Sequence, residues 1–148
     1  MTKEICFDLD GTLVDFYAVD NWLPKLRAYD ASPYMDATPM FSMNSLARIL
    51  NNAQRNGWII KIISWSSKNS TPDFDMEVSN AKRKWLNKHL ASVKFDEINV
   101  VPYGTPKSNF GNGILFDDEK PNRDEWHGVA YDATDIIATL KEILKNES

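Results

Sequence analysis

Two aspartates stand two residues apart where an apolar segment near the N-terminus ends. The apolar run over residues 5–7 leads into Asp8 and Asp10, and Gly11 follows them directly. The run predicts a buried strand, and the glycine predicts that the chain turns away there. Burying a carboxylate is costly unless a cation or hydrogen bonds compensate it. Because Mg²⁺ prefers oxygen ligands, the pair predicts a magnesium site at the end of this strand.

Four further polar residues stand directly after predicted strands or in the loop that follows one. They are Ser64, Lys107, Asp117 and Asp118. In a parallel sheet covered by helices, the carboxyl ends of the strands share one rim, and ligands bind there. We therefore expect a hydroxyl, a lysine and several carboxylates to converge with Asp8 and Asp10 on a single site.

The elements that must position these residues alternate along the chain. Short apolar runs predict five strands, over residues 5–8, 58–63, 98–101, 113–116 and 129–131. Helical spacing predicts helices over residues 43–53, 78–90 and 136–144. We expect Ser42 to cap the first of these helices, and Asp132 with Asp135 to form a capping box before the last. This alternation predicts an α/β fold, with a five-stranded parallel sheet and helices on both of its faces.

Residues 16–41 interrupt this alternation. Residues 16–30 have roughly helical spacing around Pro24, which predicts a short or kinked helix, and residues 31–41 have no clear period. We expect this insert to be a small flap or cap over the end of the first strand, too short to be a second domain. Residues 65–75 are expected to form a polar loop. The whole chain, residues 1–148, is predicted to be one domain.

Composition narrows the classes of partner. The net charge is −4 and there is no long basic run, which argues against a large nucleic-acid-binding face. We expect neither a signal peptide nor a membrane-spanning segment, so no membrane partner and a cytoplasmic setting. Cys6 is the single cysteine, which excludes an intrachain disulfide and predicts a buried, reduced thiol.

The residues taken together favour phosphoryl transfer. Carboxylates from two strands can hold one Mg²⁺, while Lys107 and the Ser64 hydroxyl suit phosphate oxygens. One aspartate then remains to act as a nucleophile and form an aspartyl-phosphate. A second aspartate can protonate the leaving oxygen and later activate water.

The same residues resemble the four motifs of phosphatases of the haloacid dehalogenase (HAD) superfamily. Residues 7–12, Phe-Asp-Leu-Asp-Gly-Thr, resemble the first motif, and the strand ending in Ser64 resembles the second. Lys107 resembles the third motif, and Asp117 with Asp118 the fourth. The motifs stand in the expected order, so the resemblance spans nearly the whole chain and implies a Rossmann-like HAD fold with a minimal cap.

The resemblance also implies a role for each residue. Asp8 would be the nucleophile and Asp10 the general acid and base. Mg²⁺ would be held by the Asp8 carboxylate, the backbone carbonyl of Asp10 and an aspartate of the fourth motif. We favour Asp118 for this last ligand, with Asp117 supporting it by orienting Lys107 or a metal-bound water.

Within the superfamily, the second acid Asp10 favours phosphoryl transfer over dehalogenation. The chain also lacks the Lys-Thr-Gly-Thr sequence and the large extra domains of the ATP pumps. A closer resemblance, to the small 5'(3')-deoxyribonucleotidase branch, is suggested by Asp15-Phe16, by Ser64 and by the ten-residue step from Lys107 to Asp117. That resemblance implies that Phe16 lies against the substrate, and we expect Trp65 to add a second aromatic wall. The insert is shorter than the cap of that branch, which predicts a more open site.

We therefore expect a Mg²⁺-dependent phosphomonoester hydrolase that acts on a small phosphorylated substrate, a nucleoside monophosphate. One alternative is a phosphatase of a sugar phosphate or of a nucleic-acid terminus. Another is a non-catalytic module that binds phosphate or nucleotide.

Structural interpretations of the same residues also stay open. They are a strand cap for Ser64, a solvated loop lysine for Lys107, a helix N-cap for Asp117 and Asp118, and core packing for Phe16 and Trp65. Outside the motifs, we expect Lys82-Arg83-Lys84 to be a solvated helix face, and His89 and His127 to be surface or packing residues.

Overall fold

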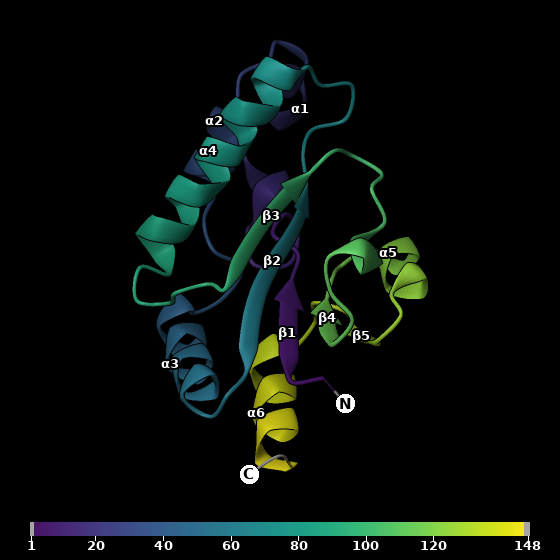
Figure 1. The fold of residues 1–148 in the computed structure, drawn as a ribbon. Helices are drawn as coiled ribbons and strands as arrows, with labels where there is room; N and C mark the ends of the chain where they lie inside the picture. The colour runs from purple at the N-terminus through teal and green to yellow at the C-terminus, as the bar shows by residue number, and fades with distance from the viewer. Residues whose placement is uncertain (1, 147–148) are drawn as a thin grey trace.

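A five-stranded parallel sheet forms the centre of the computed structural model, which describes residues 2–146 (Figure 1). The strands are β1 (Glu4–Phe7), β2 (Ile59–Trp65), β3 (Glu97–Val101), β4 (Ile114–Phe116) and β5 (Val129–Tyr131). Their order in the sheet is β3-β2-β1-β4-β5, and every neighbouring pair is parallel. β1 is therefore the central strand, and the carboxyl ends of all five strands lie at one edge.

Helices cover both faces of this sheet. They are η1 (Phe16–Ala18), α1 (Trp22–Arg27), α2 (Ser32–Asp36), α3 (Met43–Arg55), α4 (Pro72–His89), η2 (Lys107–Asn109), α5 (Lys120–Glu125) and α6 (Ile136–Asn146). Figure 1 shows α3, α4 and α6 on one side of the sheet and α5 on the other. The predicted α/β class with five parallel strands and helices on both faces is confirmed, and it is consistent with a Rossmann-like fold.

The two faces differ in how much apolar surface they bury. On the side of α3, α4 and α6, strand residues such as Ile62 join a large core. On the side of α5, Ile63 belongs to a small cluster that also contains Cys6, Leu115 and Trp126. Successive strand residues point to opposite faces, so both faces of β2 are buried. This explains why the strand segments are continuous apolar runs.

The starts of two of the longer helices, α4 and α6, differ from the sequence-based expectation. Helix α4 begins at Pro72, inside the predicted loop over residues 65–75. The side chain of Thr71 accepts a hydrogen bond from the Phe74 N–H, and Pro72 occupies the first helical position, where it is well tolerated. The predicted capping box before α6 is wrong: Asp135 accepts from the Ala138 N–H, while Asp132 accepts from the Thr134 N–H in the preceding turn.

The insert is joined to the sheet by a narrow neck. Val14 and Pro39 form an isolated antiparallel bridge, and the Asp15 N–H donates to the Thr38 carbonyl beside it. The insert holds three short helices, η1, α1 and α2, where one kinked helix was predicted. The indole of Trp85 on α4 donates to the Ala37 carbonyl at 2.8 Å and anchors the insert there. No helix within residues 2–146 is long and apolar enough to cross a membrane.

Candidate functional site

Lys107 connects two aspartates at the carboxyl ends of β1 and β4. Its ammonium lies 2.9 Å from Asp8 Oδ1 and 2.7 Å from Asp117 Oδ2. Only 2 % of its side chain is exposed, so the interpretation as a solvated loop lysine is wrong. Burial alone would lower the pKa of Lys107, but the two carboxylates raise it above its ordinary value. Lys107 is therefore a fixed positive charge at the floor of the site.

Thr12 and Gly11 bring Asp118 beside Asp8. Thr12 Oγ1 lies 3.2 Å from Asp8 Oδ2 and 3.1 Å from Asp118 Oδ1, and it accepts a hydrogen bond from the Asp118 N–H. Gly11 has a φ of +81°, and a Cβ at this position would collide with the Asp118 carboxylate. Glycine is needed here both for the left-handed turn and for the room that it leaves to Asp118.

Three carboxylates gather at this point and carry more negative charge than the lysine compensates. Oxygens of Asp8, Asp117 and Asp118 all lie within 4.8 Å of one another. Burial, together with the charge of Asp8, raises the pKa of Asp118 from 3.8 to about 8. Burial and Asp8 also raise the pKa of Asp117, against the effect of Lys107. A set of hard oxygen ligands with uncompensated negative charge fits a divalent cation such as Mg²⁺.

The neighbouring side chains of Asp117 and Asp118 differ in their hydrogen-bond partners. Asp117 accepts hydrogen bonds from Lys107, from the Asn122 amide and from the Glu119 N–H, and it is fully buried. Asp118 is partly exposed, and its carboxyl group has only Thr12 and the neighbouring acid Asp8 as side-chain hydrogen-bond partners among residues 2–146. Asp118 is thus better placed than Asp117 to give an oxygen to a metal, while Asp117 holds Lys107.

Asp10 lies beside a second buried lysine that the sequence did not predict for the site. Lys82 Nζ of α4 is 3.3 Å from Asp10 Oδ2, and the Lys82 side chain is 2 % exposed. The expected solvated face of Lys82-Arg83-Lys84 is therefore wrong for Lys82, although Arg83 and Lys84 are exposed. The helical spacing could have predicted that Lys82 is buried, because Lys82 follows Val78 by four residues and precedes Trp85 by three and so lies on the same face of the helix.

Burial also affects the proton affinity of Asp10. It raises the pKa of this carboxyl group, and Lys82 opposes the rise while Asp8 adds to it. A carboxyl group with a raised pKa that lines a pocket is suited to give and take protons.

Ser64 is held by Lys82 at the end of β2. The Ser64 hydroxyl accepts a hydrogen bond from Lys82 Nζ at 2.6 Å, and the residue is fully buried. The loop beyond it, with Ser66 and Ser67, lines the pocket. The proposed contact between Ser64 and a phosphate stays a prediction.

A pocket of about 510 Å³ opens above these groups. Its floor includes Asp8, Asp10 and Lys107. Its walls come from the insert, the end of β2 with the loop that follows, the loop after β3, and Glu119 with Asn122 after β4. Seven aromatic residues line the pocket beside polar residues such as Arg27 and Lys68: Phe16, Tyr17, Trp22, Tyr29, Tyr34, Trp65 and Tyr103. Such a pocket is large enough for a small organic phosphate.

The two predicted wall residues lie in the pocket lining, but they differ in what they offer a ligand. Phe16 is 2 % exposed and stacks on Tyr34 at a centroid distance of 4.6 Å, so most of its ring packs inside the insert. Trp65 is partly exposed, donates from Nε1 to the Thr105 carbonyl and lies 4.8 Å from the Tyr103 ring. Tyr17 and Tyr103, which the sequence did not predict, are 50 % and 52 % exposed and present more ring surface.

The chain matches no model of a known protein family and no curated protein.

Proposed function

We propose that this chain is a HAD-type phosphatase, a Mg²⁺-dependent phosphomonoester hydrolase that forms an aspartyl-phosphate and acts on nucleoside monophosphates. One observation carries the proposal. At the floor of an aromatic-walled pocket, Asp8 is held by a buried lysine, with a second acid, Asp10, and a third carboxylate, Asp118, beside it.

In the first step, an Asp8 carboxylate oxygen attacks phosphorus and the bond from phosphorus to the leaving oxygen breaks. The proton of the Asp10 carboxyl group passes to that leaving oxygen, which departs as an alcohol. The buried position of Asp10, which raises its pKa, supports this role because the group must be protonated when the bond breaks.

In the second step, water attacks phosphorus and gives a proton to Asp10, while the bond between Asp8 and phosphorus breaks. Inorganic phosphate leaves, and both aspartates return to their starting states. Lys107 lies beside Asp8 throughout and stabilises the charge on the transferring phosphoryl group. When bound, Mg²⁺ would be held by Asp8, Asp118 and the Asp10 carbonyl, and would neutralise charge between these carboxylates and the phosphate.

The aromatic walls support a nucleotide as the substrate. A nucleobase presents a flat face that stacks on aromatic side chains, worth about 1–3 kcal/mol for each base. Tyr17 of the insert and Tyr103 of the loop after β3 both line the pocket and are half-exposed. A sugar phosphate has no such face and would leave these walls unused.

Phosphate release from a panel of esters in the presence of Mg²⁺ tests the proposal. We expect deoxynucleoside monophosphates to be hydrolysed faster than sugar phosphates and 3'-phosphorylated oligonucleotides. The reverse ranking would overturn the nucleotide assignment, and binding of a nucleotide without hydrolysis would identify a non-catalytic module.

Replacement of the nucleophile tests the mechanism within the same assay. We expect Asp8→Asn to lower kcat by about 1,000-fold or more, since an essential nucleophile contributes on this scale. Asp20→Asn removes an exposed aspartate of the insert outside the pocket lining and is the matched control, with activity expected at the wild-type level. Activity that survived Asp8→Asn would contradict the mechanism.

A further inference from the structure

Lys82 lies outside the four sequence motifs. Its ammonium is nevertheless within hydrogen-bonding distance of three oxygens beside the site. Its Nζ lies 2.6 Å from Ser64 Oγ, 2.7 Å from the Trp65 carbonyl and 3.3 Å from Asp10 Oδ2. The ring of Tyr34 lies 4.8 Å from the same atom. Lysine has three N–H donors, so these three oxygens account for all of them.

The position of Lys82 requires a reason, because a buried ammonium is costly unless it is well paired. The three oxygens come from β2 and from the turn after β1, and the ring comes from the insert. Lys82 therefore connects three parts of the chain that form the floor and the wall of the pocket. If this position of α4 only had to fill the core, an apolar side chain would serve without the cost of burying an ammonium.

Asp10 depends on Lys82 for its placement. In residues 2–146, Lys82 makes the only hydrogen bond recorded to the Asp10 carboxylate, and it contacts one of the two oxygens, Oδ2. The other oxygen remains available to a ligand in the pocket that Asp10 lines. Lys107 makes the corresponding contact with the nucleophile, at Asp8 Oδ1. The two buried lysines thus hold the two catalytic aspartates separately.

We propose that Lys82 is a positioning residue that holds Asp10 in the orientation from which it passes its proton to the leaving oxygen. This inference rests on the proposed function and deepens it. Lys82 also donates to the Ser64 oxygen, so the proton of the Ser64 hydroxyl points away from Lys82. Lys82 is not among the residues that line the pocket, so in this proposal it acts through Asp10 and not on the phosphate or the leaving group.

The test uses two esters that differ in how much their leaving group needs a proton. Phenyl phosphate leaves as a basic phenolate and needs the general acid, whereas p-nitrophenyl phosphate leaves as a stable anion and needs it little. The quantity to compare is kcat/KM, which includes only the steps up to the departure of the leaving group. We expect Lys82→Met to lower kcat/KM about 100-fold for phenyl phosphate and only a few-fold for p-nitrophenyl phosphate, since general acid catalysis contributes on this scale.

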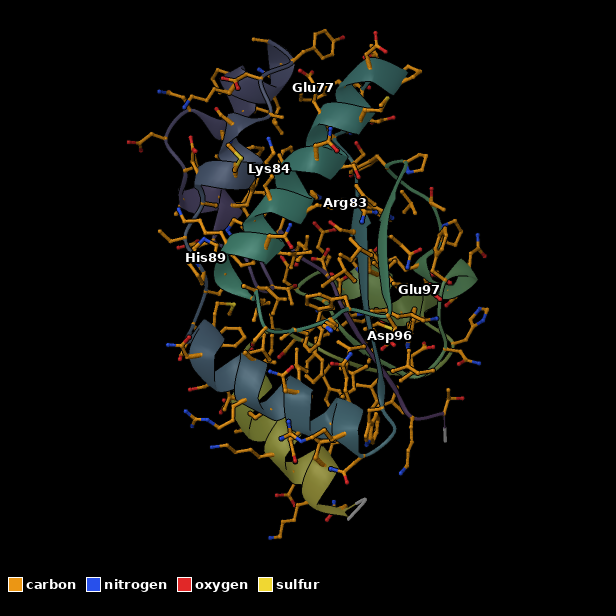
Figure 2. The ribbon with its side chains drawn as sticks, turned by 60° about the vertical axis from the view of Figure 1, so that its left-hand side comes forward. Glu77, Arg83, Lys84, His89, Asp96 and Glu97 are labelled. Carbon is orange, nitrogen blue, oxygen red and sulfur yellow. The ribbon has the colours of Figure 1, made fainter. Side chains whose placement is uncertain are left out.

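Two comparisons sharpen the result. Asp10→Asn should show the same difference between the esters, and adding Lys82→Met to it should cause little further loss, because both changes remove one function. Lys84→Met is the matched control: it removes an exposed lysine from the same helix, and Figure 2 labels this residue on α4. We expect wild-type kcat/KM for both esters with Lys84→Met.

An equal loss for both esters with Lys82→Met would overturn the inference, because a phosphate-binding or merely structural lysine would affect both alike. Thermal melts accompany each variant. If Lys82→Met does not fold, Lys82→Gln replaces it. Its shorter, uncharged amide can satisfy part of the buried oxygens, so we expect a smaller loss that is still larger for phenyl phosphate than for p-nitrophenyl phosphate. Failure of both variants to fold would make Lys82 a structural requirement and would contradict the inference.

The same assay separates this inference from the function on which it rests. Wild-type protein that released phosphate from neither ester with Mg²⁺ would overturn the proposed function and the inference together. Active wild-type protein with equal losses in Lys82→Met would overturn the inference alone.

Discussion

The floor and the wall of the pocket are built in different ways. The floor consists of charged side chains at the ends of β1 and β4 and in η2, and its buried members such as Lys107 and Asp117 contact one another at hydrogen-bonding distance. The wall includes aromatic rings of the insert, of Trp65 at the end of β2 and of Tyr103 in the loop after β3. There Tyr17 and Tyr103 are half-exposed.

This difference assigns separate tasks to the two regions. Groups fixed at strand ends are held in one geometry, which suits chemistry. Half-exposed rings such as those of Tyr17 and Tyr103 can vary without disturbing the sheet, which suits the choice of substrate. We therefore expect changes in the floor to affect metal binding and rate, and changes in the wall to affect substrate affinity.

The largest of these effects is expected from Asp118 in the floor. Asp118→Asn should weaken Mg²⁺ binding by about 100-fold in calorimetry, because it removes a charged ligand from the cluster. Asp124→Asn, at an exposed position in the helix that follows, should bind Mg²⁺ as the wild type does. Unchanged Mg²⁺ affinity in Asp118→Asn would show that the ion, if bound, is held by another carboxylate of the floor.

A smaller effect is expected in the wall. Tyr103→Ala should raise KM for a nucleoside monophosphate about 10-fold and leave kcat within about two-fold, since one stacking surface is lost. The same variant should hydrolyse glycerol phosphate, which has no flat ring, with unchanged KM. Tyr131→Ala, a partly exposed tyrosine on β5, is the control. A fall in kcat instead of a rise in KM would mean that the wall takes part in the chemistry.

The smallest expected effect is a pH dependence of the protein's stability, and it arises from Asp118 in the floor. The folded protein raises the pKa of Asp118 from 3.8 to about 8, so between these values the folded state binds more protons than the unfolded state. Stability without metal should therefore fall as pH rises from about 4 to about 8. Because Mg²⁺ competes with protons for these oxygens, it should raise the melting temperature more at pH 8 than at pH 6.

Melting curves with and without Mg²⁺ measure this difference. We expect the rise in melting temperature caused by Mg²⁺ to be roughly 3 °C larger at pH 8 than at pH 6, which corresponds to about 1 kcal/mol for a domain of this size. Asp118→Asn should abolish it. A Mg²⁺ effect that was equal at both pH values would contradict the assignment of the excess charge to Asp118.

The sequence predicted the floor better than the wall, for a physical reason. Asp8, Asp117 and Asp118 directly follow apolar strands, and a parallel sheet places such residues together whatever the intervening helices do. Tyr103 stands in a loop after β3, and no periodicity predicts the path of a loop. The helices of the insert and α5 are too short to show a helical period.

Lys82 is the instructive exception. Its neighbours Arg83 and Lys84 suggested a solvated charged face, but the spacing to Val78 and Trp85 placed it on the buried side of α4. The run of charged residues predicted exposure at this position, and the helical spacing predicted burial. The spacing was right, because the Ser64 hydroxyl and the Trp65 carbonyl accept hydrogen bonds from the buried ammonium.

The most direct test of the central claim is to trap the intermediate on Asp8. Asp10→Asn should still react with p-nitrophenyl phosphate, which needs no proton, but it should lose the base that activates water for the second step. A rapid acid quench followed by mass spectrometry measures the phosphate adduct and its position. We predict a burst of about one nitrophenol per protein molecule and a phosphate on Asp8. Steady turnover without a burst and without any phosphate on Asp8 would contradict the account.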